Sequence, residues 1–200
     1  MVKVPVAGRV KTRLGADIGM PAAAWWFRHQ SRSLLRRLRD PRWQIVLAVT
    51  PDRDGMQSRF WPHDLFRFGQ GRGDIGQRMA RALGRFRGPV ALIGADIPAV
   101  TKGHIADAFA SLGSARSVVG PATDGGFWLI GLRNPEPRCS GLFADVRWSH
   151  EDTLKDAMPK LPQPVATVAT LSDVDTASDL GRYQLEQSAD RLHHALSKRA

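Results

Sequence analysis

Apolar runs of strand length alternate with apolar positions at helical spacing along almost the whole chain. The expected strands are residues 1–6, 44–50, 65–68, 89–94, 117–120, 127–132 and 165–171. The expected helices are residues 21–39 and 74–87, followed by helices that begin near residues 101, 149 and 176. Strands that alternate with helices are typical of an α/β fold with a largely parallel sheet. The run at 127–132 follows the preceding strand too closely for a crossover, so we expect it to be antiparallel or in a side ribbon.

Polar residues at the expected helix starts support these boundaries. Asp74 is a natural N-cap. Ser149 with Asp152, and Thr176 with Asp179, have the spacing of capping boxes. Residues 7–19 read as a basic loop, and the segment after the strand at 44–50 reads as a polar loop.

Length and composition indicate one domain over residues 1–200, with residues 184–200 as a helical tail. Hydrophobic residues make up 42% of the chain, enough for a core, and no apolar run is long enough for a membrane span. No signal peptide is recognisable, and the single cysteine, Cys139, fits a reducing compartment. We therefore expect a cytoplasmic protein. The first strand is unusually short, so we also expect a version extended upstream to be more stable.

The chain is strongly basic, with 29 Lys and Arg against 19 Asp and Glu and a formal net charge of +10. The arginines are scattered over the expected helices, without a dense tail or an aromatic-interleaved motif. This distribution argues against nucleic-acid binding and suits small phosphorylated substrates.

Two acids follow expected parallel strands. Asp96 comes after the run at 89–94 and Asp124 after the run at 117–120. Because parallel strands end at one rim of a sheet, we expect both carboxylates there, where they suit Mg²⁺ or Mn²⁺. The alternative is that both residues only shape turns. Asp173 and Asp175 flank one residue and can face the same side, as further metal or substrate contacts or as turn residues.

Two loops have the character of phosphate sites. Gly8, Arg9, Lys11 and Arg13 form a cationic loop that could cradle phosphates, or be a solvated basic turn. Residues 71–76 satisfy GxGxxG, but the expected strand before them is short, and Asp74 would repel a pyrophosphate. We give this second motif little weight.

Several motifs in a fixed order carry a family resemblance. They are GRVKTRL at 8–14, GDIGQRM at 73–79, IGADIP at 93–98, GPATDGGFWLIG at 120–131, WS at 148–149 and DVDT at 173–176. Together they resemble the bacterial transferase 1 family associated with radical-SAM/selenodomain proteins, over about residues 2–183. That family belongs to the GT-A-like nucleotide-diphospho-sugar transferase superfamily.

The resemblance implies a Rossmann-like GT-A fold, with a mostly parallel central sheet and helices on both faces, that binds a nucleotide with Mg²⁺ or Mn²⁺. The expected catalytic residues are Lys11, Asp96 and Asp124, and the expected metal ligands are Asp96, Asp124 and Asp175. The expected nucleotide contacts are Gly8, Arg9, Lys11, Arg13, Arg78, Gly125, Gly126 and Trp128.

The implied activity is that of a metal-dependent transferase acting on a nucleotide-activated donor, foremost a glycosyltransferase that uses a nucleotide-diphospho-sugar. A nucleotidyltransferase of the guanylyltransferase kind is the alternative, and the residues do not choose between the two. A non-catalytic nucleotide-binding accessory protein is a third possibility, against which the presence of Lys11, Asp96 and Asp124 argues. The expected partners are a nucleotide or nucleotide-sugar and an acceptor that the sequence does not identify.

Overall fold

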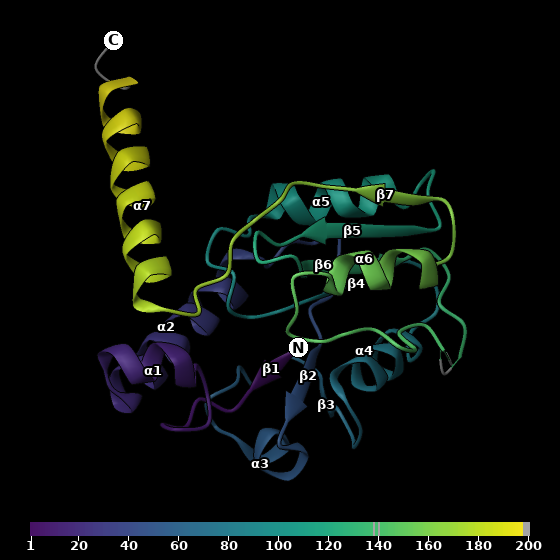
Figure 1. The fold of residues 1–200 in the computed structure, drawn as a ribbon, viewed down its shortest axis with the longest axis horizontal. Coiled ribbons are helices and arrows are strands. Elements are labelled where there is room, and N and C mark those ends of the chain that lie inside the picture. The colour runs from purple at the N-terminus through teal and green to yellow at the C-terminus, as the bar shows by residue number, and fades with distance from the viewer. Residues whose placement is uncertain (138, 140, 198–200) are drawn as a thin grey trace.

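A computed structural model describes residues 1–137, 139 and 141–197, and only the backbone of residues 190–197. The strands are β1 (Val2–Lys3), β2 (Leu47–Thr50), β3 (Arg67–Gly69), β4 (Val90–Ile93), β5 (Ser117–Pro121), β6 (Phe127–Leu132) and β7 (Val165–Thr167). The helices are α1 (Thr12–Ile18), α2 (Met20–Arg37), α3 (Asp52–Gln57), α4 (Ile75–Leu83), α5 (Lys102–Ser111), α6 (Thr153–Ala157), a 3₁₀ turn (Met158–Lys160) and α7 (Ala177–Ser197). Figure 1 shows their arrangement.

The strands form two half-sheets, ordered β1-β2-β3 and β4-β6-β5-β7. All pairs in the first are parallel, as is β5 with β7. β6 lies between β4 and β5 and is antiparallel to both, and its short connection to β5 requires the antiparallel direction of that pair. The expected α/β class and the antiparallel β6 are therefore confirmed.

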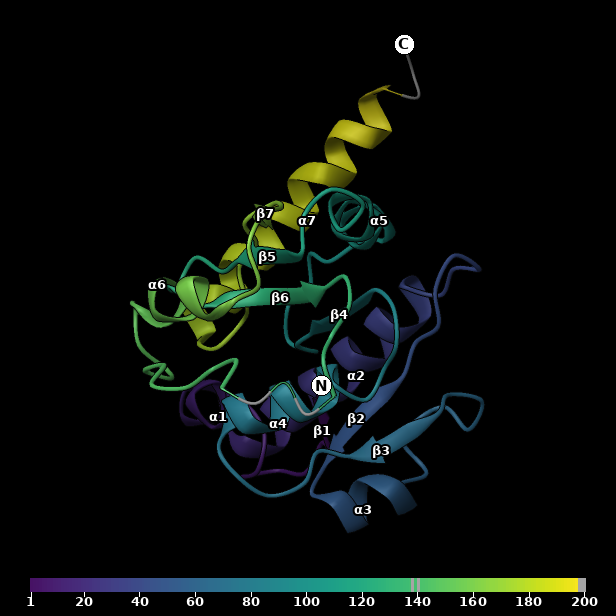
Figure 2. The same ribbon diagram turned by 90° about the vertical axis from the view of Figure 1, so that its right-hand side faces the viewer.

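Helices cover both faces of the strands (Figure 2). Val118 and Leu129 pack on one face with apolar residues of α2 and α5. Val119 and Ile130, which alternate with them, pack on the other face with residues of α4 and α6. Because successive side chains of a strand point to opposite faces, β5 and β6 supply both apolar layers.

A largely apolar cavity of about 670 Å³ lies between the half-sheets, lined by residues of β1, β2, β4, α2 and α4. Ala48 and Ala91 are among its lining residues. The amino group of Met1 lies at this junction and donates to the backbone oxygen of Ile93. Burial lowers the pKa of this amino group to about 6, although the charge of Asp96 opposes the shift.

Two of the three helix caps expected from the sequence are present in the structure. Asp74 accepts from the backbone of Gln77 and starts α4 in a capping box. Thr176 and Asp179 bond each other at the start of α7. The expected box at Ser149 is wrong, because Ser149 has a left-handed backbone (φ 57°) and α6 starts only after Asp152.

Two short helices were not expected. α1 lies inside the expected basic loop, and α3 lies inside the expected polar loop. Neither shows the repeated apolar positions that identify a long amphipathic helix. Leu14 of α1 is fully buried and packs with Ala23 and Val174. Tertiary packing, rather than propensity, thus stabilises α1.

α7 projects from the body of the molecule, and the expected tail at 184–200 includes its distal part (Figures 1 and 2). Leu185, on the projecting part, is 74% exposed. Of the helices that the structure describes, none combines the length and apolar character that crossing a membrane requires.

Candidate functional site

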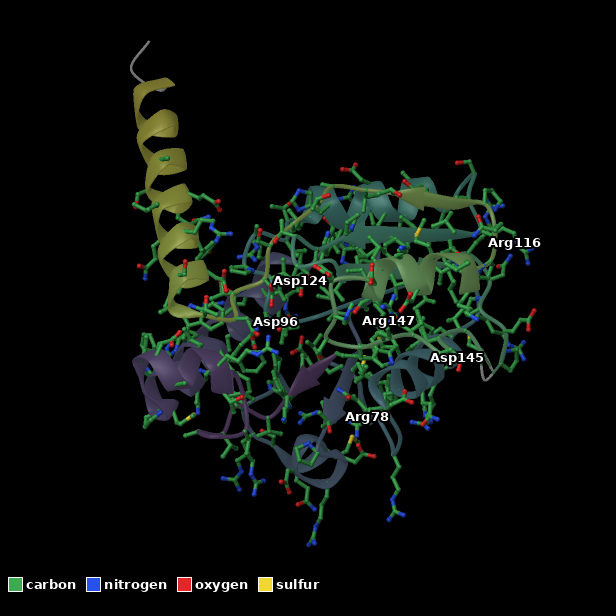
Figure 3. The ribbon with its side chains drawn as sticks, in the orientation of Figure 1. Arg78, Asp96, Arg116, Asp124, Asp145 and Arg147 are labelled. Atoms are coloured by element: carbon green, nitrogen blue, oxygen red, sulfur yellow. The ribbon has the colours of Figure 1, made fainter. Side chains whose placement is uncertain are left out.

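The candidate site lies at the rim where β1, β4 and β5 end. Lys11 follows β1, Asp96 follows β4, and Asp124 follows β5. Figure 3 shows Asp96 and Asp124 on the side of the molecule where the chain approaches α7. The segment that leads into α7 adds Asp173 and Asp175. The short connection from β5 into antiparallel β6 places Asp124 at this rim.

The ammonium group of Lys11 is surrounded by three carboxylates. Its Nζ lies 2.8 Å from Asp96 Oδ2, 3.1 Å from Asp175 Oδ1 and 3.6 Å from Asp173 Oδ2. The Lys11 side chain is only 6% exposed. Burial lowers its pKa, but the charge and hydrogen bond of Asp96 and the charges of the other carboxylates outweigh this, so its pKa lies above the usual range.

The alternation of residues 173–175 brings two acids to one side. Val174 is buried against Leu14, and its backbone N–H donates to the carbonyl of Asp96 at 3.3 Å. Since neighbouring side chains of an extended segment point in opposite directions, Asp173 and Asp175 both face Lys11. The expectation that these two acids share a face is confirmed.

The carboxyl of Asp173 has a raised pKa. Burial raises its pKa to about 6 against the opposing charge of Lys11, and the neighbouring Asp96, Asp124 and Asp175 raise it further. The influence of Asp124 shows that it belongs to the same electrostatic neighbourhood. Perturbed titrating groups collected at one rim are typical of functional sites.

Two features fix the position of Asp96. A Cβ on Gly94 would lie 2.6 Å from Asp96 Oδ1, so a larger residue there would push the Asp96 carboxylate from this position. Arg37 of α2 donates to the backbone oxygens of Val100 and Pro98, each at 2.7 Å. These two hydrogen bonds therefore connect the loop that carries Asp96 to α2. No pattern in the sequence distinguishes Arg37 from the other arginines of that helix.

Asp124 is not one of the three carboxylates that contact Lys11. Its carboxylate accepts from the backbone of Gly126 at 2.9 Å, inside its own turn. Gly125 has a left-handed backbone (φ 86°), and a side chain there would collide with the backbone of Glu151. The Asp-Gly turn considered as an alternative is thus present, while the Asp124 carboxylate remains exposed beside the cluster.

Only some residues of the cationic loop contact the acidic cluster. Arg13 donates to Asp175 Oδ2 at 2.9 Å, so Asp175 is shared between Arg13 and Lys11. Arg9 instead lies near Asp54, at 3.9 Å and well exposed. Gly8 has a left-handed backbone with open space beside it.

Trp128 and Arg78 do not join the cluster around Lys11. Trp128 is 2% exposed and donates from Nε1 to the backbone of Ala169, so its burial does not fit direct contact with a substrate. Arg78 lies on α4, and its buried Nε has no hydrogen-bond partner among the described residues. Gly76 of the GxGxxG run packs against the ring of Trp148, which covers the start of α4.

The donor set fits a hard divalent ion, because carboxylate oxygens are the ligands that Mg²⁺ and Mn²⁺ prefer. As placed, however, the carboxylates enclose the ammonium of Lys11. Within the described part of the chain, no group of three or more His, Cys, Asp or Glu is arranged to hold a metal ion. The expected set of metal ligands, Asp96, Asp124 and Asp175, therefore stays a prediction.

Comparison with known proteins identifies a family and a similar structure. The model of a family described as "Uncharacterized protein conserved in bacteria (DUF2064)" matches residues 34–150. A crystal structure described as a "putative nucleotide-diphospho-sugar transferase" from Desulfovibrio desulfuricans G20 is similar, with a TM-score of 0.75 and 29% identity. The match covers 90% of this chain and 81% of that one. No curated protein matches the chain. The structural likeness confirms the expected Rossmann-like GT-A fold.

Proposed function

We propose, since this chain belongs to the bacterial DUF2064 family, that it is a metal-dependent transferase using a nucleotide-activated donor, foremost a nucleotide-diphospho-sugar. The similarity to a protein described as a putative nucleotide-diphospho-sugar transferase supports the donor class. The narrower resemblance to the bacterial transferase 1 family stays a prediction and points the same way.

One observation carries the proposal. Asp96, Asp173 and Asp175 come together with two cations, Lys11 and Arg13, at the rim where parallel strands end. Open α/β sheets bind their ligands at this rim. Carboxylates can hold a divalent ion and the cations can pair with phosphate oxygens, so the cluster has both charges that a metal-bound diphosphate needs.

Each residue then has a distinct role. Lys11 and Arg13 would bind the donor phosphates, and Asp96 with Asp175 and Asp173 would hold Mg²⁺ or Mn²⁺. When bound, the ion would neutralise charge on the diphosphate leaving group. Asp124 is exposed and makes none of the ion pairs of the Lys11 cluster, so it is the carboxylate available to accept a proton from the acceptor.

In the proposed reaction the acceptor oxygen forms a bond to the anomeric carbon of the donor sugar. The bond from that carbon to the phosphate oxygen breaks, and a nucleoside diphosphate leaves with the electron pair. The acceptor proton passes to Asp124. Positively charged side chains near the leaving phosphate stabilise the charge that develops there.

The test is an assay of nucleotide-sugars and nucleoside triphosphates with Mn²⁺ and candidate acceptors, followed by chromatography of the products. Release of a nucleoside diphosphate from a nucleotide-sugar supports glycosyl transfer. Release of pyrophosphate from a triphosphate would instead identify nucleotidyl transfer. Binding of nucleotides without turnover would identify an accessory protein, and absence of both binding and turnover would contradict the proposal.

A further inference from the structure

We propose that Lys11 acts as a built-in cation that a divalent metal ion displaces, and that metal binding thereby releases the Lys11 ammonium for the donor phosphates. The inference rests on the proposed function and adds an order of events to it. Lys11 would be the residue that couples metal binding to phosphate binding.

The first step of the argument is charge. Three carboxylates converge on one ammonium, and Arg13 pairs with just one of them, Asp175. Without Lys11, the three partly buried carboxylates would repel one another, because no other cation contacts all three in the described part of the chain. Lys11 thus stabilises the acidic cluster while no metal ion is bound.

The second step is space. The ammonium lies 2.8 to 3.6 Å from the carboxylate oxygens, at hydrogen-bonding or ion-pair distance. A bound Mg²⁺ would require oxygens at about 2.0–2.1 Å, with its centre in the same small volume. Two cations a few ångströms apart would repel each other strongly in a partly buried site. The ammonium and the metal ion therefore exclude each other.

The third step is the path of the displaced group. Lys11 sits between β1 and α1 with a left-handed backbone (φ 46°, ψ 50°), which packing of α1 holds in place. The charge is at the end of a flexible four-carbon side chain. In this proposal, rotation of the Lys11 side chain carries the ammonium out of the cluster. Arg13 lies two residues further on, in the first turn of α1.

Opposite effects on two ligands follow from this arrangement. Removal of the Lys11 charge should strengthen binding of the metal ion alone, because the competing cation is gone. The same change should weaken binding of a nucleotide in the presence of the metal, because a phosphate contact is lost. A residue that only bound phosphate would affect the nucleotide alone.

The first measurement is a titration with Mn²⁺ alone, with free Mn²⁺ followed by electron paramagnetic resonance. We expect Lys11→Met to bind Mn²⁺ at least about tenfold more tightly than the wild type, a change of about 1.4 kcal/mol. The matched control is Lys102→Met, which removes an exposed lysine 4.0 Å from Asp40 and should leave the affinity unchanged. Equal affinities of Lys11→Met and wild type would overturn the inference.

A second measurement uses only the wild-type protein, so that it stands even if the variant folds poorly. Lysines are labelled with trace acetic anhydride and quantified by peptide mass spectrometry. Lys11, with a side chain 6% exposed, should be protected without metal and several-fold more reactive with Mn²⁺. Lys102 serves as the internal control, since its side chain is 49% exposed. Unchanged labelling of Lys11 at saturating Mn²⁺ would contradict displacement.

Failure of the inference and failure of the proposed function give different results. UDP and GDP are titrated into the wild type and Lys11→Met with Mn²⁺ present. If the wild type binds a nucleotide with Mn²⁺ but Lys11→Met gains no Mn²⁺ affinity, the function stands and the displacement does not. If Mn²⁺ displaces Lys11 but neither the nucleotides nor the nucleotide-sugars bind, the metal exchange stands and the donor class is wrong.

Discussion

Arg37 donates from Nε to the backbone oxygen of Val100 at 2.7 Å, so a helix on one face of the sheet holds the loop that carries Asp96. A second bond, from Nη2 to the carbonyl of Pro98, fixes the same loop. Neither residue of this contact belongs to the acidic cluster. The position of Asp96 nevertheless depends on it, because only one residue separates Asp96 from Pro98.

Replacement of Arg37 by Met should therefore disturb the site without removing any of its charges. Each carbonyl that loses a charged donor costs about 1.5–3 kcal/mol of stability at most. We expect a melting temperature lower by several degrees and weaker Mn²⁺ binding, measured by calorimetry. The control is Arg36→Met, an exposed neighbour on the same helix. Equal Mn²⁺ affinities in the two variants would show that Arg37 does not position Asp96.

Asp96→Asn should abolish the stabilisation by metal and nucleotide together. At a ligand concentration of about 100 times the dissociation constant, binding contributes roughly 2.7 kcal/mol, or several degrees in a domain of this size. The variant loses one ion pair of Lys11 but also one of three crowded carboxylates, so its melting temperature without ligand should stay close to that of the wild type.

A thermal-shift series with Mn²⁺ plus nucleotide measures this effect, with Asp64→Asn, from an exposed pair with Arg39, as the control. An undiminished response of Asp96→Asn would mean that the ion is held by the other acids. Unfolding of the variant would assign Asp96 a structural role.

Stability should depend on pH through Asp173. Its folded-state pKa of about 6 lies above the ordinary value of 3.8, so the folded protein binds more protons between these limits. The resulting stabilisation is fully present below about pH 4 and is lost as the pH rises through about 6. Asp173→Asn should therefore melt above the wild type at pH 8, and the difference should shrink as the pH falls to about 4. A difference that does not change with pH would contradict the shift.

Filling the cavity between the half-sheets should stabilise the fold. Four apolar residues added before Met1 could extend β1 along β4 and fill part of the 670 Å³. Gains of about 0.5–2 kcal/mol are common for cavity-filling changes. A Gly-Ser extension of equal length is the control, and equal melting temperatures of the two would contradict the expected strand.

The same extension should change the pH profile. The pKa of the Met1 amino group is lowered to about 6 in the fold, so stability should fall as the pH drops from about 8 to about 6. Both extensions move the charge away from the buried position and should reduce this loss. A melting curve series over this range measures the effect.

Much of the site could be predicted from short-range patterns. Acids that follow apolar strands located Asp96 and Asp124, and the alternation of Asp173, Val174 and Asp175 predicted their shared face. No short-range pattern in the sequence predicted the contacts between distant segments. The packing that makes α1 helical, the bonds from Arg37 and the burial of Trp128 all depend on residues that only the fold brings together.

The ion pair between Lys11 and Asp175 joins residues that are 164 positions apart in the chain. The entropy lost on closing so long a loop must be met by contacts formed elsewhere before the pair can persist. The hairpin of β5 and β6 needs only local contacts and can form early. During synthesis the acidic cluster is complete only after the segment beyond β7 has left the ribosome, so competence to bind a metal ion there is gained at the end of folding.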